Sequence, residues 1–334
     1  MWAFTRPIRF IRYLFVWRVN GSLARIPRCL SAELSLFLGN TIASRLPTRQ
    51  ASPWRKSLSP WDRYGGLSLV GKKINKIPEA SWPVETVIFA YPGKLTYGPG
   101  ELIFWELKLM GESADHGFFL EVILPAVEEA GRLSDQRWQR LNRLWGQFEV
   151  HAVYAARGSH WEPIVSDGRL DLDYRVTSTQ WAEGLTFGAE SERIFDRLTW
   201  VTPFDLSDDA GGRRRRRRRK RPRKKDAPNL QEILEALTVR MSQLLPGKHH
   251  TPEDVWDALS EEEQASLRAA MEQATRIPVH HANLEGAPKH WPGRWMGTQI
   301  FPSIPRPIVP YLELASLLHI GRQTHFGCGT FTIS

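Results

Sequence analysis

Near the C-terminal end, residues 317–331 (LLHIGRQTHFGCGTF) combine three glycines with imidazole and guanidinium side chains. Glycine adopts positive φ angles at low cost and has no Cβ, so a glycine-rich loop can present successive backbone N–H groups to a phosphate. The same spacing is typical of a helix C-cap followed by a bulge, and the loop alone leaves both interpretations open. The candidate binding residues are His319, Gly321, Arg322, Gly327 and Gly329, and the candidate catalytic histidine is His325.

A second candidate for phosphate contact is a run of cations between Gly212 and Asp226. Twelve of the thirteen residues from 213 to 225 are Arg or Lys. Removing these twelve from the 45 basic residues of the chain leaves 33, against 36 acidic residues, so the net charge of +9 comes from this one stretch. Cations that repel one another cannot form a core, and we expect a basic loop over 211–226 that binds phosphates. Its candidate contacts are Arg213, Arg214, Arg215, Arg216, Arg217, Arg218 and Arg219.

A shorter basic row lies on a helix that we expect to begin at Ser134. Arg137, Arg140 and Arg143 recur at three-residue spacing and therefore share one helical face. Such a row is usually a solvated surface, but in a nucleic-acid-binding protein it is also a candidate for groove contact. Both interpretations remain open.

The other imidazole and thiol groups form no recognisable metal pattern. The pairs His249–His250 and His280–His281, together with His290, lack cysteine partners and a spacing that would aim two imidazoles at one ion. Cys29 and Cys328 cannot form a disulfide framework or a four-cysteine zinc site. We therefore expect no metal and no cofactor, and a reducing cytoplasm is the simplest compartment.

Length and composition limit the fold class. A chain of 334 residues with 42% hydrophobic content is long enough for about two domains, each with its own core. Collagen-like and wholly disordered chains are excluded. No stretch approaches the roughly 18 consecutive apolar residues of a membrane span, and we expect no membrane partner.

The N-terminal residues mix arginines with large apolar side chains, which superficially suggests a targeting peptide or an amphipathic anchor. Apolar residues at alternating positions from 11 to 19 favour a half-buried strand instead. A helix capped by Ser31 should follow and reach Arg45, where a cation complements the helix dipole. Residues 47–83 are rich in Pro, Ser and Gly and predict a long irregular connection.

Each half of the chain reads strand, helix, strands, helix, strand. In the first half, further strands are expected over 84–91, 101–110 and 147–156, further helices over 118–130 and from Ser134, and a polar stretch over 158–168 closes the half. In the second half, strands are expected over 193–206 and 325–333 and helices over 229–245 and 311–320, with two capped acidic helices inserted at 251–276.

This order, with helices on one face of an antiparallel sheet, is typical of the ferredoxin-like fold. We therefore predict an α+β protein of two tandem ferredoxin-like (RRM-like) domains, residues 1–165 and 166–334. The second domain would carry the basic loop 211–226, the acidic helical insertion 251–276 and the glycine-rich loop 321–329.

The glycine-rich segment resembles the C-terminal signature of the CRISPR repeat-cleaving endoribonucleases, members of the superfamily named repeat-associated mysterious proteins. That signature reads His, a hydrophobic residue, Gly, a basic residue and a small polar pair, followed by Phe-Gly-x-Gly and an aromatic residue. Segments 97–131, 198–206, 230–244 and 293–300 resemble further family segments in the same order, so the resemblance covers roughly residues 84 to 334. The matching signature positions are His319, Gly321, Arg322, Phe326, Gly327, Gly329 and Phe331.

The resemblance implies two ferredoxin-like domains and metal-independent cleavage of precursor CRISPR RNA within its repeats. In the family, the 2′-hydroxyl upstream of the scissile phosphate attacks it and leaves a 2′,3′-cyclic phosphate. Many members keep the repeat stem-loop and join other subunits of a CRISPR effector complex. The implied partners are therefore CRISPR RNA and such subunits, in a prokaryotic cytoplasm.

The chain departs from the family where a catalytic histidine is common, on or just after the first helix, because no histidine precedes His116. Some histidine-lacking members, notably in type IV systems, are thought to rely on arginines. Arginine stays protonated, so it can stabilise the phosphorane but is a poor acid or base. Arg28 and Arg45 are the candidates here, and an interpretation as solvated cations stays open.

Three functions compete. The first is the endoribonuclease, and the second is a catalytically silent RNA-binding subunit of an effector complex, which the missing histidine favours. The third is a basic nuclear protein that uses the arginine run as a localisation signal, which the resemblance elsewhere disfavours.

Overall fold

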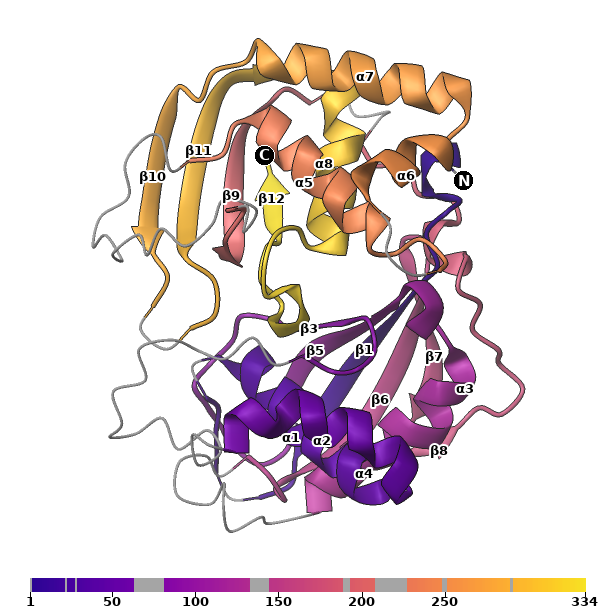
Figure 1. Cartoon of the computed structure of the whole chain (residues 1–334). Helices are drawn as coiled ribbons and strands as arrows, with labels where there is room; N and C mark the ends of the chain where they lie inside the picture. The colour runs from indigo at the N-terminus through magenta and orange to yellow at the C-terminus, as the bar shows by residue number, and fades with distance from the viewer. Residues whose placement is uncertain are drawn as a thin grey trace. The chain divides into compact units, whose positions relative to one another are not determined.

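The computed structural model describes residues 2–21, 23–27, 29–62, 81–132, 144–188, 193–207, 227–247, 251–288 and 291–334. They form two compact units, one of Arg9–Glu183 and one of Gly184–Ser334 with Met1–Ile8 (Figure 1). The predicted division between residues 165 and 166 falls inside β7 (His160–Ser166), which pairs with β6 (Phe148–Arg157). The first unit extends further because β7 and β8 (Arg169–Leu170) add to its sheet, where the sequence predicted a polar closing stretch.

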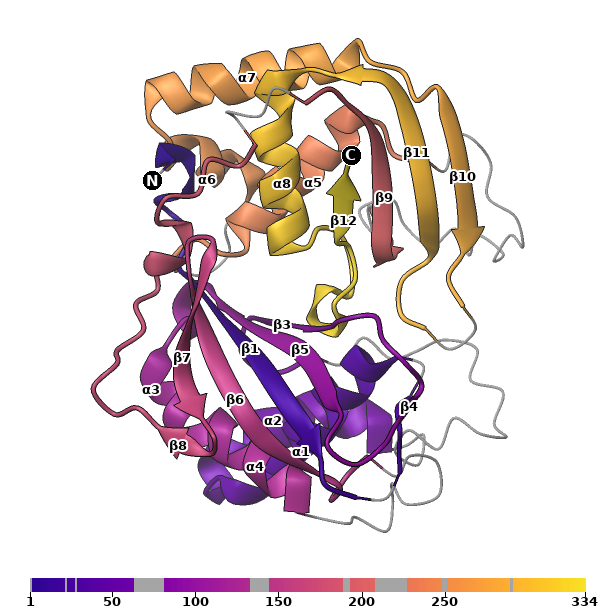
Figure 2. The ribbon, with the colours of Figure 1, turned by 180° about the vertical axis from the view of Figure 1, so that it is seen from behind.

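The unit Arg9–Glu183 contains a six-stranded antiparallel sheet in the order β3-β5-β1-β6-β7-β8. The helices α1, α2 and α4 cover one face of it (Figures 1 and 2). β1, α1, β3, β5, α4 and β6 follow one another as in the ferredoxin-like fold, and their strands pair in its order, so the predicted fold class is confirmed for this unit. The bounds are β1 Phe10–Val19, α1 Leu30–Arg45, β3 Thr86–Ala90, β5 Leu102–Met110 and α4 Leu124–Arg132, with a small two-stranded antiparallel sheet of β2 (Ala24–Arg25) and β4 (Thr96–Tyr97).

The alternation of apolar residues from position 11 to 19 correctly predicted the strand β1. Phe15 stacks on Trp105 of β5 with ring centroids 4.2 Å apart, and Trp17 stacks on Phe148 of β6 at 3.8 Å. The predicted cap at Ser31 is wrong, because α1 begins at Leu30 and places Ser31 inside the helix. The Ser31 hydroxyl instead accepts a hydrogen bond of 2.9 Å from the backbone N–H of Ala90 and so joins the helix to β3.

The irregular connection predicted from residue 47 is also wrong as far as residue 62, since α2 (Thr48–Asp62) is a helix. Ala51, Trp54 and Leu58 recur at helical spacing and are buried. Their burial outweighs the local preference of the Pro and Ser residues for a loop. The rest of that prediction, residues 63–80, lies outside the described residues.

The helix predicted over residues 118–130 is divided into three parts. α3 (His116–Phe118) is capped by the Asp115 side chain and leads into a π-helical turn over Phe119–Ile123, after which α4 begins. Pro125 was expected to kink the helix, and the π-helical turn lies directly before it, where a proline removes a backbone donor. The second helix, predicted from Ser134, falls in residues 133–143, outside the described residues.

The second unit contains a four-stranded antiparallel sheet in the order β10-β11-β9-β12, with α5 and α8 on the same side of it (Figures 1 and 2). The chain order and pairing are again ferredoxin-like, with a helical insertion of α6 and α7, as predicted. The bounds are β9 Phe195–Phe204, α5 Leu230–Ser242, α6 Pro252–Asp257, α7 Glu261–Thr275, β10 His281–Gly286, β11 Trp295–Ile304, α8 Val309–Leu318 and β12 Phe331–Ile333. Short 3-10 turns lie at Ala3–Thr5, Gly111–Ser113, Gln180–Ala182, Arg306–Ile308 and Thr324–Phe326.

The sequence predictions of helix caps and of the closing strand in this unit were partly correct. Thr251 and Ser260 form capping boxes with Asp254 and Glu263, as expected for the insertion. The closing strand, predicted from residue 325, begins only at Phe331 because residues 324–326 form a 3-10 turn. Within the described ranges, no helix is long and apolar enough to cross a membrane.

An N-terminal segment belongs to this second unit although its sequence neighbours belong to the first. Phe4 is fully buried, and its ring centroid lies 5.0 Å from that of Tyr311 on α8. Trp2 contacts the same tyrosine ring and also Phe187. Burial, followed by the charge of Glu263, raises the pKa of Tyr311 to about 12, so this hydroxyl stays neutral at physiological pH. The segment therefore completes the aromatic core of the C-terminal unit.

Replacing Phe4 with Ala tests this assignment. We expect the substitution to destabilise the C-terminal unit by about 3–5 kcal/mol, because it removes a buried aromatic ring and leaves a cavity. Hydrogen exchange of the α8 amides measures this unit separately from the other. Phe104→Ala, at a ring that is 41% exposed in the first unit, is the control and should cost about 0.5 kcal/mol or less. Unchanged α8 exchange in Phe4→Ala would contradict the assignment.

Candidate functional site

The C-terminal end of β9 positions the candidate site. The carbonyl groups of the consecutive residues 203 to 205, at and just after its last residue, each accept a backbone hydrogen bond. Pro203 accepts from the N–H of Gly329 at 3.0 Å, Phe204 from Arg294 at 3.0 Å, and Asp205 from Arg322 at 2.9 Å. The glycine-rich loop and the segment before β11 are therefore fixed against the same three residues.

The glycine-rich loop between α8 and β12 turns back sharply on itself. Five of its residues have positive φ angles: His319, Gly321, Gln323, Gly327 and Gly329. At two of them only glycine fits, since a Cβ on Gly329 would lie 1.9 Å from the carbonyl oxygen of Ile320, and a Cβ on Gly321 would lie 2.6 Å from that of Asp205. Glycine is therefore required at both positions, because the loop backbone lies against the backbone of Ile320 and of Asp205.

Most loop amides with an assigned partner bond to protein carbonyl groups. The N–H of Gly327 donates to Thr324 at 2.7 Å, and that of Ile320 donates to Gly329 at 3.1 Å. Gly327 and Gly329 were predicted to present their amides to phosphate. In this conformation their amides hold the loop in shape, and phosphate contact through them would require these bonds to break.

His319, another predicted RNA contact, is fully buried. Its Nδ1 lies 3.1 Å from the carbonyl oxygen of Cys328, so the imidazole joins the two ends of the loop. Arg240 of α5, 2% exposed, donates from Nε to the carbonyl of Leu318 at 3.1 Å and so satisfies a carbonyl at the end of α8. Arg240 was not among the predicted site residues, although a single arginine beside the apolar stripe of α5 could have indicated a buried structural contact.

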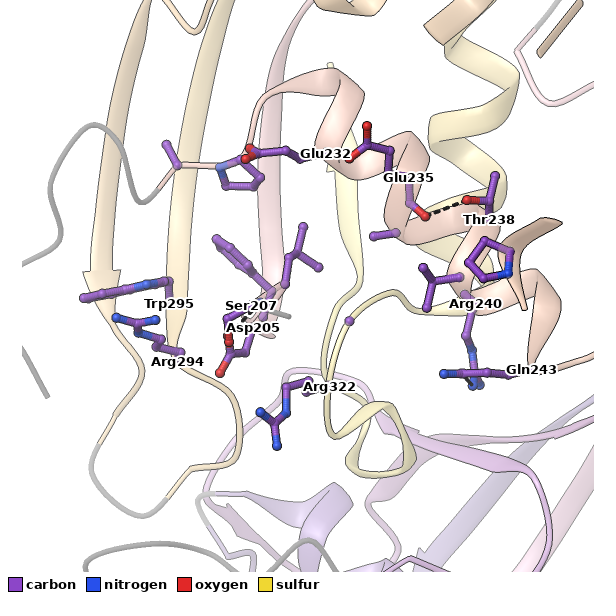
Figure 3. A pocket seen from close by; sticks show the side chains of 18 residues that line it. Asp205, Ser207, Glu232, Glu235, Thr238, Arg240, Gln243, Arg294, Trp295 and Arg322 are labelled. Atoms are coloured by element: carbon purple, nitrogen blue, oxygen red, sulfur yellow. Dashed lines mark hydrogen bonds between the residues drawn. The ribbon is translucent and has the colours of Figure 1, made fainter. Parts of the chain in front are cut away.

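A cavity of about 660 Å³ opens beside the loop (Figure 3). Gly321 and Arg322 line it from the loop, Arg294 and Trp295 from the start of β11, and one face of α5 from the other side. Ser207 and Ala227 also line it, and these are the residues that flank the undescribed segment 208–226. Of the predicted site residues, the structure thus brings Gly321 and Arg322 to a pocket.

Three charged side chains lie together at one end of this pocket. Figure 3 shows Asp205 between Arg294 and Arg322. The guanidinium carbon of Arg294 lies 5.0 Å from the ring centroid of Trp295, in a cation–π contact. The Asp205 Oδ1 accepts hydrogen bonds from the N–H and hydroxyl of Ser207, at 3.1 and 2.6 Å. Asp205, Arg294 and Trp295 were missed because only the fold places them beside Arg322.

The acidic side chains of α5 that line the pocket already accept hydrogen bonds from other protein groups. Glu232 accepts from the N–H of Asn229 at 2.8 Å in a capping box, and Glu235 accepts from Gln231 at 2.7 Å. Their position along α5 places them at a different part of the pocket from Arg322 (Figure 3). The groups best placed for a ligand are therefore Asp205 and Arg294.

The predicted catalytic residues that the structure describes, His325 and Arg45, do not line this pocket. His325 is half-buried in the 3-10 turn of the loop, with its ring centroid 4.0 Å from that of Phe326. Arg45 is on α1 in the other unit, where its Nη1 lies 2.5 Å from the Glu129 carboxylate. Glu129 therefore offsets the charge that the prediction assigned to catalysis. Arg28, Arg137, Arg140, Arg143 and the arginines 213–219 lie outside the described residues.

The first unit contains two further titratable groups with shifted pKa values, His116 and Glu106. His116 is the first histidine in the chain, and its Nδ1 lies 2.9 Å from the hydroxyl of the buried Tyr13. Burial lowers the pKa of His116, so its ring is neutral near pH 7. Burial alone would raise the pKa of Glu106, but the charges of Arg12 and Lys108 lower it overall. Both groups are held inside the fold by these partners.

The histidines 249, 250 and 290 lie outside the described residues, so the expectation that they form no metal site stays a prediction. Within the described ranges, no cluster of three or more His, Cys, Asp or Glu side chains is arranged to hold an ion.

Proteins similar to this chain are found among solved structures. A Cas6 product complex is 17% identical, with 98% of this chain and 100% of that chain covered and a TM-score of 0.46. A partial Cas6–RT–Cas1–Cas2 complex is 13% identical, with a TM-score of 0.48, and covers 97% of this chain. The chain spans 46% of the matched chain in that complex and 28% of the matched chain in a Cas6–RT–Cas1–Cas2 complex. No family model and no curated protein sequence matches the chain. These identities are too low to assign a function.

Gly329→Ala tests the close backbone approach in the loop. The added Cβ would collide with the Ile320 carbonyl in addition to the strain of a positive φ. Gly184→Ala in the same unit is the matched control, because Gly184 has a φ of +68° and open space around its missing Cβ. We expect the control to cost about 1–2 kcal/mol, and Gly329→Ala to cost at least about 2 kcal/mol more. Thermal unfolding measures both, and equal losses would contradict the steric argument.

Proposed function

We propose that this chain belongs to the CRISPR repeat-cleaving endoribonucleases and cuts precursor CRISPR RNA within its repeats, independently of metal. The observation that carries the proposal is that signature positions have defined tasks in the loop. His319 joins its two ends, and Gly321 and Gly329 allow backbone contacts that no other residue permits. Phe326 and Phe331 are buried beneath it. These contacts support the proposal, because each of these signature positions has a structural role in the loop of this chain.

The architecture supports the same proposal. Two ferredoxin-like units follow one another in the chain, each with a strand-helix-strand-strand-helix-strand order and an antiparallel sheet. This is the tandem arrangement that the sequence resemblance implies. A fold alone does not define an activity, so the proposal depends on the loop and its pocket.

The proposed reaction is an internal phosphoryl transfer. The 2′-hydroxyl upstream of the scissile phosphate loses its proton and its oxygen bonds to phosphorus. The bond from phosphorus to the 5′-oxygen then breaks, and that oxygen takes up a proton. The products are a 2′,3′-cyclic phosphate and a 5′-hydroxyl end, and the cut repeat hairpin stays bound for the effector complex.

Such a reaction needs a base, an acid and stabilisation of the negative phosphorane. His325 is our candidate for one proton transfer, since an imidazole titrates near neutral pH. Arg28 and Arg45 are the candidates for charge stabilisation. Arg45 can fill this role only where a substrate phosphate competes with Glu129 for its guanidinium.

A catalytically silent RNA-binding subunit is the second candidate function. It is favoured by the absence of any histidine before His116 and by the carboxylate that already neutralises Arg45. Such a subunit would use the same loop and pocket to hold the repeat.

A cleavage assay separates these functions. We expect the purified protein to cut labelled CRISPR repeat RNA once in EDTA and to leave a cyclic phosphate. His325→Ala should slow the cut by roughly 10²–10⁴-fold if His325 transfers a proton. His281→Ala, at an exposed histidine on β10 of the same unit, should leave the rate unchanged. Tight binding without a cut would support the silent subunit. Binding without preference for repeat RNA would refute both functions.

The run of cations gives a separate prediction, since the residues that flank segment 208–226 both line the pocket. Deleting residues 213–225 should weaken RNA binding and flatten its dependence on salt, because fewer counterions are released when fewer phosphates are neutralised. Fluorescence anisotropy at several KCl concentrations measures the slope. A replacement of the same residues by Gly and Ser controls for loop length, and circular dichroism checks that the fold is retained. An unchanged affinity would mean that the run has another role.

A further inference from the structure

The guanidinium of Arg294 points to an anionic or acceptor-bearing ligand. One face of it lies on the Trp295 ring, which fixes its plane. Trp295 is 5% exposed and Arg294 is half-buried, so the pair forms a wall of the pocket and is not a freely solvated side chain. Among the residues that the structure describes, no protein acceptor is within hydrogen-bond distance of this guanidinium. Its planar edge of N–H donors is therefore available to a molecule in the pocket.

The neighbouring carboxylate of Asp205 needs the opposite kind of partner, a hydrogen-bond donor. Oδ1 of Asp205 is occupied by the two donors of Ser207, and Oδ2 has no partner in the described part of the chain. A ligand that suits this end of the pocket must therefore offer acceptors to Arg294 and donors to Asp205. Inorganic phosphate offers acceptors but would bring negative charge against the carboxylate.

Size and charge limit the ligand further. A cavity of about 660 Å³ lies within the range of small-molecule sites, which is roughly 300–1,000 Å³, and has room for one nucleotide. The carboxylate of Asp205 and the guanidinium of Arg294 carry opposite formal charges, so a base with both donors and acceptors suits this pair better than a free anion.

We propose that this pocket binds one unpaired guanine nucleotide of the RNA, a specificity site that rests on the proposed RNA-processing function. Guanine presents two adjacent donors, N1–H and the N2 amino group, which Oδ2 of Asp205 can accept together through its two lone pairs. It presents two adjacent acceptors, O6 and N7, which match the fork of an arginine. Asp205 reads the first pair and Arg294 the second.

The other bases fit this set of groups less well. Uracil has one N–H donor between two carbonyl oxygens and no amino group. Adenine offers an amino donor beside N1 and N7 acceptors, but lacks the carbonyl oxygen that pairs with N7 in guanine. Cytosine offers a single amino donor to the carboxylate. Guanine alone offers two adjacent donors to Oδ2 of Asp205 and two adjacent acceptors to the arginine fork at the same time.

Modified bases test the two contacts separately. The probes are fluorescein-labelled RNA octamers of uridine with one central guanosine, inosine, 7-deazaguanosine or uridine, and the readout is the dissociation constant from anisotropy. We expect guanosine to bind at least about fivefold more tightly than uridine, since a bidentate base contact contributes about 1–3 kcal/mol of discrimination. Inosine lacks the N2 amino group and 7-deazaguanosine lacks N7, so each should lose part of this preference.

Variants assign each loss to a residue. Asp205→Asn should bind guanosine and inosine octamers equally, and Arg294→Gln should bind guanosine and 7-deazaguanosine octamers equally. Arg294→Lys keeps the charge but not the fork, and should lose the N7 preference while it retains most of the salt dependence. Arg268→Ala is the matched control, because Arg268 lies over Trp256 at 5.3 Å in the same unit but does not line the pocket. It should behave as wild type.

Equal wild-type affinity for all four octamers would overturn the guanine site. A guanine preference that survives both Asp205→Asn and Arg294→Gln would overturn its location. Cleavage of repeat RNA by the wild type is measured independently. If the repeat is cut but the octamers bind equally, the pocket proposal fails and the endoribonuclease proposal stands. If guanine is preferred but no repeat is bound, the reverse holds.

Discussion

The three backbone hydrogen bonds at the end of β9 are the interaction on which the rest of the site depends. Pro203, Phe204 and Asp205 receive the amides of Gly329, Arg294 and Arg322, two from the glycine-rich loop and one from the segment before β11. Backbone bonds fix position without using side chains, so the side chains of Asp205 and Arg294 can face the pocket. The close packing also explains why two loop positions are glycine. A Cβ at Gly321 would collide with the carbonyl of Asp205, and a Cβ at Gly329 would collide with the carbonyl of Ile320.

The signature residues consequently divide into two groups with different tasks. His319, Gly321, Gly329 and the buried phenylalanines shape the loop, and they would be needed even in a protein that catalyses nothing. Arg322 is the signature residue whose side chain reaches the pocket. A match to the motif therefore argues first for this loop conformation. Any activity has to be argued from the groups that the loop positions, which is why the endoribonuclease and the silent subunit share one structure.

The sequence predicted the elements whose signals are local. Alternating apolar residues gave β1, and capping residues located the starts of α6 and α7. Two elements were missed because tertiary contacts outweigh local preference: α2 forms despite its Pro and Ser residues, and β10 (HANLEG) has little apolar character but pairs with β11 along its whole length. The pocket could not be predicted at all. It joins Asp205 to Arg294 and Arg322, and no periodicity relates residues that meet only through strand pairing and a tight turn.

Charge is distributed unevenly between scaffold and loop, and this has a consequence for specificity. Outside residues 213–225 the chain carries 33 basic and 36 acidic residues, which is nearly balanced. Under the proposed function, general affinity for RNA would come from the cation run, because contacts to phosphates do not distinguish sequences. Discrimination would come from a few oriented groups, such as Asp205 with Arg294 in the proposed guanine site, where an unmatched base leaves a polar group without a partner. Ser207 and Ala227, on either side of segment 208–226, line that pocket, so the proposed sources of affinity and of specificity are neighbours in the chain.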